Sequence, residues 1–186
     1  MKNPYLFDLA KSKPTVTKPA GTVRGAYQDV FPIVKGQKDA MFLVTLKPGG
    51  IREPHWHPDA WEFDYCIKGK ARMSVVGPKN EWKIFDVEPG QVVFVPMGFF
   101  HYFENIGEDD LQFLISFNNS EAESDDDIGV SVSLGGVPNH VLAATFGVPE
   151  KVFDQVPKLH KEVAIVKGRS DVLPLSIPAR RESRDP

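Results

Sequence analysis

Short runs of apolar and β-branched residues alternate with turn residues between positions 41 and 117. The runs are shorter than typical helices, and clusters of glycine, proline and asparagine separate them, which is the pattern of an antiparallel sandwich or barrel. The pattern therefore predicts an all-β body over residues 25–120. Its expected strands are Met41–Leu46, Trp61–Ile67, Ala71–Val76, Trp82–Val87, Val92–Val95, His101–Glu104 and Leu111–Phe117.

The segments on either side of this body have different patterns. Prolines divide the first residues into short apolar pieces, which predicts an extended arm along a neighbouring surface. An acidic run breaks the β pattern and predicts a loop, and two proline-led stretches with helical spacing follow it. We expect one domain over 1–186, divided into an arm (1–24), a barrel (25–120), an acidic lid-like loop (121–137), two short helices (138–157) and a C-terminal extension (158–186).

Composition excludes several classes of protein. The hydrophobic fraction of 41% supports a folded core, and the net charge of -3 provides no positive field to attract nucleic acid. Cys66 is the only cysteine, so an intramolecular disulfide and a multi-cysteine zinc site are excluded. No stretch approaches the ~20 apolar residues that cross a membrane. We expect a soluble, cytoplasmic protein without nucleic-acid or membrane partners.

The candidate chemistry begins at a His-Trp-His sequence. His55 and His57 are two residues apart, so on a strand both imidazoles project from one face. On an unbroken strand, Glu62 would point to the opposite face from His55 and His57. A break at residues 58–60 would let the chain re-enter the sheet with Glu62 facing inward. His101 is the best candidate for a fourth ligand. Three imidazoles and one carboxylate would hold a divalent first-row metal ion with positions open for substrate or dioxygen.

These residues fit two motifs at the spacing of the cupin superfamily, which the chain resembles. The first motif is Gly-x5-His-x-His-x4-Glu-x6-Gly, and the second is Gly-x5-Pro-x-Gly-x2-His-x3-Asn. The resemblance implies a double-stranded β-helix, or jelly-roll barrel, around a metal. The alternatives are two solvent-facing histidines near a turn, or a cupin that binds no metal. The matching positions are Gly49, His55, His57, Glu62 and Gly69, then Gly90, Pro96, Gly98, His101 and Asn105.

Within the superfamily, the sequence His-Trp-His-Pro-Asp-Ala-Trp-Glu at 55–62 is similar to one half of the two-domain oxalate decarboxylases. The similarity extends over roughly residues 5–157 and includes the flanks of the barrel. Those enzymes have two cupin domains and this chain has one. Because the family pairs two cupins face to face, the resemblance implies a homodimer or a higher assembly.

The resemblance also implies a manganese site at which Arg52 fixes the free carboxylate of oxalate. A guanidinium can hold a carboxylate through two parallel hydrogen bonds. The alternative is that Arg52 pairs with Glu53 or another surface acid. The ligand set alone does not select manganese, since imidazole also suits iron, nickel, copper and zinc.

The proton donor is the open point of this interpretation. The position of the family's loop glutamate falls on Ser124, with Glu123 and Asp125 on either side. These two acids, or Glu121, are candidates to replace it, and the alternative is a solvated acidic loop. With a donor, the expected reaction releases carbon dioxide and formate. Without one, oxidation by dioxygen to peroxide is the alternative. A further alternative is a non-catalytic cupin that stores metal or senses a ligand.

Overall fold

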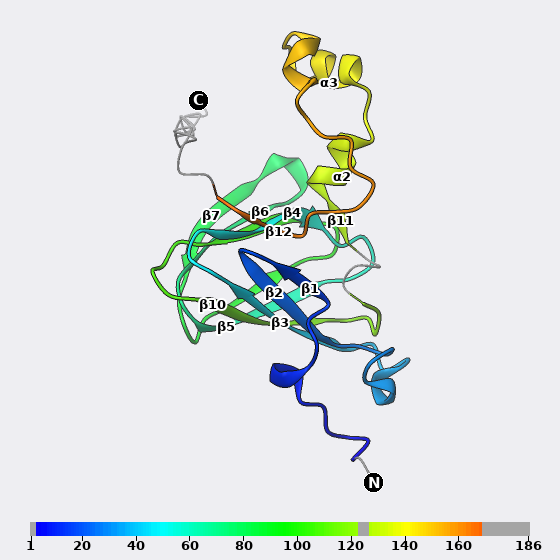
Figure 1. Cartoon of the computed structure of the whole chain (residues 1–186), viewed down its shortest axis with the longest axis vertical. Coiled ribbons are helices and arrows are strands. Elements are labelled where there is room, and N and C mark those ends of the chain that lie inside the picture. Colours follow the sequence, from blue (N-terminus) through cyan, green and yellow to red (C-terminus); the bar gives the residue numbers. More distant parts are fainter. Residues whose placement is uncertain (1–2, 123–126, 169–186) are drawn as a thin grey trace, which may run out of the picture.

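The computed structural model describes residues 3–122 and 127–168, and they fold into two facing antiparallel sheets (Figure 1). The first sheet has the strand order β1-β2-β3-β10-β5-β8 and the second has the order β11-β4-β9-β6-β7, with β12 also paired to β4. The strands are β1 (Val16–Lys18), β2 (Gly21–Ala26), β3 (Ala40–Leu46), β4 (Gly50–Trp56), β5 (Glu62–Lys68), β6 (Ala71–Val76), β7 (Trp82–Val87), β8 (Val92–Val95), β9 (Phe100–Asn105), β10 (Leu111–Phe117), β11 (Ile128–Gly129) and β12 (Ile165–Lys167).

The fold is the jelly-roll barrel that the sequence predicts. Inward-facing residues alternate with outward-facing ones along β3 and β10, so each strand gives one side chain in two to the space between the sheets. The rings of Phe103 on β9 and Phe113 on β10 meet across that space at 5.0 Å, edge to face. The core is therefore shared by both sheets, and the candidate ligands project into the same interior.

The helical elements are short and lie outside the barrel. They are α2 (Val130–Gly135) and α3 (Asn139–Phe146), with the 3-10 turns η1 (Leu9–Lys11), η2 (Pro32–Val34), η3 (Pro78–Asn80) and η4 (Glu150–Phe153). Figure 1 shows α2 next to β11 at the sheet and α3 beyond it, away from the sheets. In the described part of the chain, no helix is long and apolar enough to cross a membrane.

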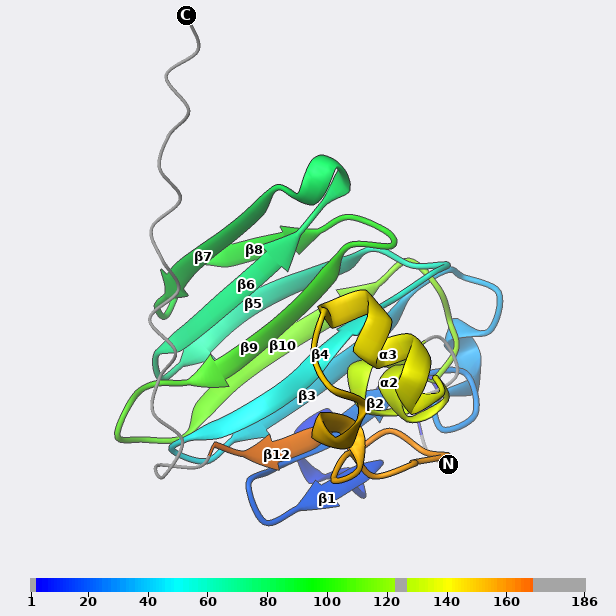
Figure 2. The ribbon, with the colours of Figure 1, turned by 90° about the horizontal axis from the view of Figure 1, so that it is seen from above.

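The structure departs from the prediction at both ends of the barrel. Residues 21–26 form β2 rather than part of an arm, and Val23 is buried in the core because β2 pairs along β3. The predicted loop 121–137 contains β11 and α2, and the second predicted helix is the 3-10 turn η4. The predicted C-terminal extension supplies β12, which runs beside β4 (Figure 2). These short elements depend on pairing with β3 and β4, which local periodicity does not report.

Two glycines of the motifs adopt backbone conformations that favour glycine. Gly98 has φ +76 in the turn before His101, and Gly69 has φ +85 between β5 and β6. A Cβ atom on Gly69 would also lie 2.7 Å from Leu111 Cα. The motif positions therefore maintain the turns that set the ends of the ligand-bearing strands.

Candidate metal centre

The four candidate ligands come together inside the barrel. His55 lies on β4 and faces His101 on β9, because these two residues are partners in the strand pairing. His57 follows the end of β4, and Glu62 is the first residue of β5. All four side chains are buried, and one ligand atom from each lies within 4.8 Å of all the others. The structure thus assembles the set His55, His57, Glu62 and His101 that the sequence predicts.

Glu62 reaches the cluster from the opposite sheet. The bend at residues 58–60 ends β4, and β5 then pairs with β10 and β8 in the first sheet. The chain therefore crosses between the sheets here, instead of re-entering the same sheet as the sequence suggested. Because the two sheets face each other, the inward side of β5 points at the inward side of β4. Glu62 Oε2 lies 3.1 Å from His57 Nε2 and 2.8 Å from His101 Nε2.

Backbone carbonyls orient two of the histidines. His55 Nδ1 lies 2.7 Å from the carbonyl oxygen of Glu53, and His101 Nδ1 lies 3.0 Å from that of Phe99. A carbonyl oxygen only accepts, so Nδ1 carries the hydrogen and Nε2 turns toward the cluster. This is the usual arrangement of a metal-ligating histidine. The donor set and its orientation fit a divalent metal ion.

The electrostatic surroundings also favour the protonation states that bind metal. The pKa of His55 is held well below its ordinary value, first by burial and then by the nearby charge of Arg52. Burial acts to raise the pKa of Glu62, but the charge and hydrogen bonds of His101 and His57 outweigh it and bring this pKa well below the ordinary value. A neutral imidazole and an ionised carboxylate are the forms that ligate metals.

Arg52 is a buried cation beside the cluster. Its side chain is 2% exposed, Nη1 donates to the carbonyl oxygen of Ala164 at 3.2 Å, and Nη2 forms an ion pair with Asp127. The predicted alternative partner, Glu53, instead accepts hydrogen bonds from the backbone N–H groups of Ala164 at 2.6 Å and Ser131 at 3.2 Å. The pairing of β4 with β9 is irregular between Arg52 and His55, which allows both Arg52 and Glu53 to be buried.

Asp127 is the residue of this site that the sequence analysis missed. Its side chain is 0% exposed, and its Oδ1 lies 3.8 Å from His55 Nε2. The residue ends the acidic run and directly precedes β11, which pairs with β4 at Trp56 and His55. The attachment of β11 to β4 carries Asp127 to the cluster. Its position at the end of the run, next to an apolar residue, marks where the chain can rejoin the sheet but does not show that its side chain turns inward.

Of the other acids of the run, Glu121 is the one that the structure describes, and it does not reach the site. Glu121 is exposed and accepts a hydrogen bond of 2.6 Å from Gln28 Nε2, so it faces away from the cluster. Glu123 and Asp125, which the sequence analysis proposed as proton donors, lie outside the described residues. Of the two acids of this run that the structure describes, Asp127 is the one that contacts Arg52.

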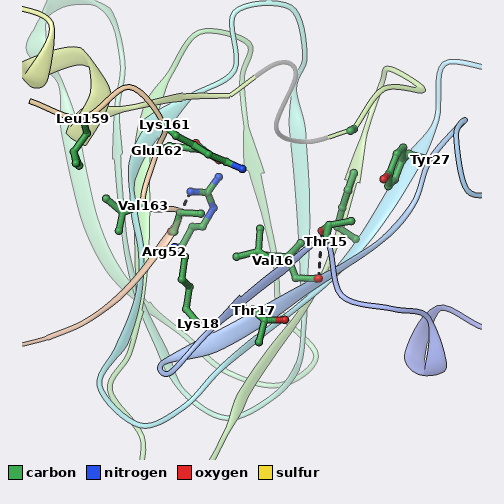
Figure 3. A pocket seen from close by; sticks show the side chains of 14 residues that line it. Thr15, Val16, Thr17, Lys18, Tyr27, Arg52, Leu159, Lys161, Glu162 and Val163 are labelled. Carbon is green, nitrogen blue, oxygen red and sulfur yellow. Dashed lines mark hydrogen bonds between the residues drawn. The ribbon is translucent and has the colours of Figure 1, made fainter.

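A cavity of about 540 Å³ adjoins Arg52 (Figure 3). One side is formed by Thr15 and the adjoining strand β1, including Lys18, and the other by residues of the segment 159–164. The four candidate ligands are not among its described lining residues. Arg52 is thus the residue that links this cavity to the cluster.

The aromatic residues around the motifs are used for packing. Trp56 packs against Phe100 with 5.8 Å between ring centroids, and Trp61 packs against Phe94 at the same separation. Cys66 is buried in the core, as its place on the inward face of the strand predicts. His140 and His160 lie outside the cluster.

Comparisons with known proteins place these features in a family. The family model described as Cupin matches residues 7–153. Oxalate decarboxylase OxdC of Bacillus subtilis is 32% identical over 155 residues, which cover 83% of this chain and 39% of the relative. Spherulin-1B of Physarum polycephalum is 31% identical over 152 residues, which cover 78% of this chain and 58% of that protein.

A solved structure of Bacillus subtilis oxalate decarboxylase, from work on its Mn(II) centres, superposes with a TM-score of 0.76 at 32% identity. The superposition covers 87% of this chain and 41% of the solved one. The chain thus spans about two fifths of the length of the oxalate decarboxylases that it matches, at 39% and 41%.

Proposed function

This chain belongs to the cupin family, and on that premise we propose that it is a manganese-dependent enzyme that decarboxylates oxalate or a similar small carboxylate. One observation supports this proposal above the others. A buried guanidinium, Arg52, lies on the same strand as His55, directly beside the cluster of three histidines and one glutamate. A cation kept from water at that position suits a ligand that carries a carboxylate next to the one bound at the centre.

The side chains would divide the reaction between them. His55, His57, Glu62 and His101 would hold the metal ion, which supplies Lewis-acid and redox chemistry when bound. Arg52 would bind the free carboxylate of oxalate and orient the carbon–carbon bond. As this bond breaks, carbon dioxide leaves and a proton is added to the remaining carbon, giving formate. The proton must come from an acid near the site, and Glu123 and Asp125 remain the proposed donors.

Manganese is proposed on the strength of the relatives. The donor set of three imidazoles and one carboxylate also suits iron, nickel, copper and zinc. The similar solved oxalate decarboxylase of Bacillus subtilis has Mn(II) centres. Manganese is therefore the first metal to test.

Two other functions for the same site have specific support. Oxidation of oxalate by dioxygen gives two molecules of carbon dioxide and one of peroxide, and needs no proton on carbon. It is favoured by the outward direction of Glu121, which leaves that acid unable to protonate a ligand. A non-catalytic role in metal storage or ligand sensing is the other alternative, because Spherulin-1B, whose name states no reaction, is almost as similar as the decarboxylase.

We also propose a homodimer and a cytoplasmic location. The homodimer rests on the resemblance to the two-domain oxalate decarboxylases, in which two cupins pair face to face. The cytoplasmic location follows from a single cysteine that is buried and unpaired as a disulfide. Light scattering coupled to size-exclusion chromatography tests the first, and fractionation of the source cells tests the second.

The decisive experiment combines metal analysis with a two-product assay. Protein purified without added metal is analysed for its metals, and the same sample is given oxalate while formate and peroxide are measured separately. Stoichiometric manganese with formate supports the decarboxylase. Peroxide without formate supports the oxidase, and bound metal with neither product rejects oxalate as the substrate. Arg52→Lys keeps the charge but loses the two-pronged contact, so we expect a higher KM for oxalate with retained metal.

A further inference from the structure

The ion pair of Arg52 and Asp127 joins the 540 Å³ cavity to the metal-ligand cluster. Arg52 lines the cavity, and Figure 3 shows its guanidinium beside Lys161 and Glu162, on the side of the cavity that faces β1. Asp127 Oδ2 contacts Arg52, while Asp127 Oδ1 lies 3.8 Å from His55 Nε2. A path of direct contacts therefore runs from the cavity through both charged groups to the cluster.

Only one oxygen of the Asp127 carboxylate is well satisfied. Oδ2 pairs with Arg52, whereas the buried Oδ1 has no hydrogen-bond partner among the described residues. A buried acceptor left without a donor costs about 1–3 kcal/mol. The carboxylate is therefore held at this position chiefly by Arg52, and an incoming carboxylate that satisfies the guanidinium equally well can take its place.

We propose that Asp127 is an internal competitor for Arg52, whose carboxylate occupies the guanidinium until the carboxylate of a small acid ligand replaces it. This inference rests on the proposed function, because Arg52 is the residue proposed to bind the ligand. The exchange leaves Arg52 neutralised before and after binding, and the displaced Asp127 carboxylate must turn to water so that it is not left as an unpaired buried charge. A ligand without a carboxylate cannot make the exchange, so the pair selects for carboxylates.

The size of the effect follows from the occupancy of Arg52 by Asp127. If Asp127 holds the guanidinium for about nine-tenths of the time, the apparent affinity for a ligand is reduced about tenfold. Removing the Asp127 carboxylate should restore that affinity. A proton donor at position 127 would behave differently, since its loss would slow turnover without tightening binding.

Oxalate binding tests the competition directly. The metal-loaded protein is titrated calorimetrically with oxalate in dioxygen-free buffer, as wild type and as Asp127→Asn and Asp127→Ser. We expect both variants to bind oxalate about tenfold more tightly than wild type. The control is Asp109→Asn, which removes the same charge from an exposed position and should leave the affinity unchanged. In an Arg52→Gln background, Asp127→Asn should have no effect on affinity.

Unchanged or weaker binding in both Asp127 variants overturns the inference, as does an absence of oxalate binding in every protein. Tighter binding that persists with Arg52→Gln shows a general charge effect, which also rejects competition for Arg52. Failure of the proposed function is distinguished by products. Tighter binding without formate or peroxide keeps the competitor and rejects the reaction, while formate with unchanged affinity keeps the reaction and rejects the competitor.

The unmutated protein offers a second test that does not depend on the folding of the variants. Carboxyl groups are labelled with a water-soluble carbodiimide and an amine, and the labelled sites are identified by mass spectrometry. Oxalate should increase labelling of Asp127, because the displaced carboxylate becomes accessible. Asp109 should be labelled equally with and without oxalate. Protection of Asp127 by oxalate, or no change, would contradict the exchange.

Discussion

His101 is held in the cluster through both nitrogens of its ring. Nδ1 donates to the carbonyl oxygen of Phe99, and Nε2 lies 2.8 Å from Glu62 Oε2. The first contact belongs to the turn before β9, and the second crosses to the facing sheet. The Nδ1 contact orients the ring within its own sheet, and the close approach of Nε2 to Glu62 Oε2 brings together two atoms that can share one metal ion.

Replacing His101 with alanine should remove the metal and leave the fold intact. Loss of one of four ligands weakens a metal site strongly, so we expect His101→Ala to be purified with far less than one metal ion per chain. Elemental analysis of the purified protein measures this. His140→Ala, at an exposed histidine on α3, is the matched control and should keep its metal. A full complement of metal in His101→Ala would contradict the ligand assignment.

The ligands could be predicted from the sequence because the spacing of His55 and His57 along a strand, together with two motifs, specifies them. The residue that pairs with Arg52 could not be predicted from the sequence. Residues of an acidic run have no periodicity, so sequence does not show which carboxylate turns inward. The pairing of β11 with β4 selects Asp127, and this two-residue strand leaves no pattern of its own.

At the level of elements, Glu53 attaches the outer segments to β4. Its carboxylate accepts from the backbone of Ala164, next to β12, and from Ser131, on α2. Ala164 has φ 62, an unfavourable conformation for a residue with a side chain, and its carbonyl oxygen also accepts from Arg52. Glu53 thereby helps to position the residue that holds Arg52.

Glu53→Gln should destabilise the protein, because one carboxylate oxygen would be replaced by an amide NH2 that faces a backbone donor. We expect a loss of about 2 kcal/mol in the free energy of unfolding, within the range for buried hydrogen bonds to charged groups. Urea unfolding measures this loss. The exposed Glu150→Gln is the control and should change stability by less than about 0.5 kcal/mol. Equal stability of both variants would show that Glu53 does not anchor these segments.

The turn at Gly69 provides a second prediction at this scale. Gly69→Ala combines a left-handed backbone with a clash, since its Cβ would lie 2.7 Å from Leu111 Cα. Gly36 has a similar φ of +72 but nothing within 4 Å of a Cβ, so Gly36→Ala isolates the backbone cost. We expect about 1–2 kcal/mol for Gly36→Ala from the left-handed conformation alone. Gly69→Ala should lose clearly more free energy of unfolding than Gly36→Ala, as measured by chemical denaturation. An equal loss in the two variants would show that the close approach to Leu111 does not destabilise the protein.

Most strands of the central barrel could be predicted because, as in β3, β9 and β10, buried positions alternate with more exposed ones. β4 was not among the expected strands, and it buries Arg52 and Glu53 in succession, which breaks this alternation. The short elements that attach to the central barrel could not be predicted from the sequence. β2 is fixed by hydrogen bonds to β3, and β11 and β12 are fixed by hydrogen bonds to β4. In β12, Ile165 lies more than a hundred residues beyond its partner Arg52 in the sequence. Such pairing depends on the complete barrel, so the residues from 158 onward were predicted only as an extension.

At the scale of the whole molecule, the cluster connects the two sheets. His55 and His101 belong to β4 and β9 of one sheet, and Glu62 belongs to β5 of the other. Burial between the sheets holds the barrel together, and a shared metal ion would add a bond between their inner faces. The site and the stability of the fold should therefore be linked through metal binding.

Removal of the metal should lower the melting temperature of the whole barrel in one cooperative transition. A ligand at a hundred times its Kd stabilises the folded state by about 2.7 kcal/mol, and this contribution disappears in the metal-free protein. We expect treatment with a chelator to lower Tm, and restored metal to raise it again, in calorimetric scans. His101→Ala is the internal control, because a protein that cannot hold the ion should melt at the same temperature with and without chelator. If wild type also keeps its Tm after verified metal removal, the cluster does not contribute to the stability of the fold, and the link between the two sheets rests on side-chain packing alone.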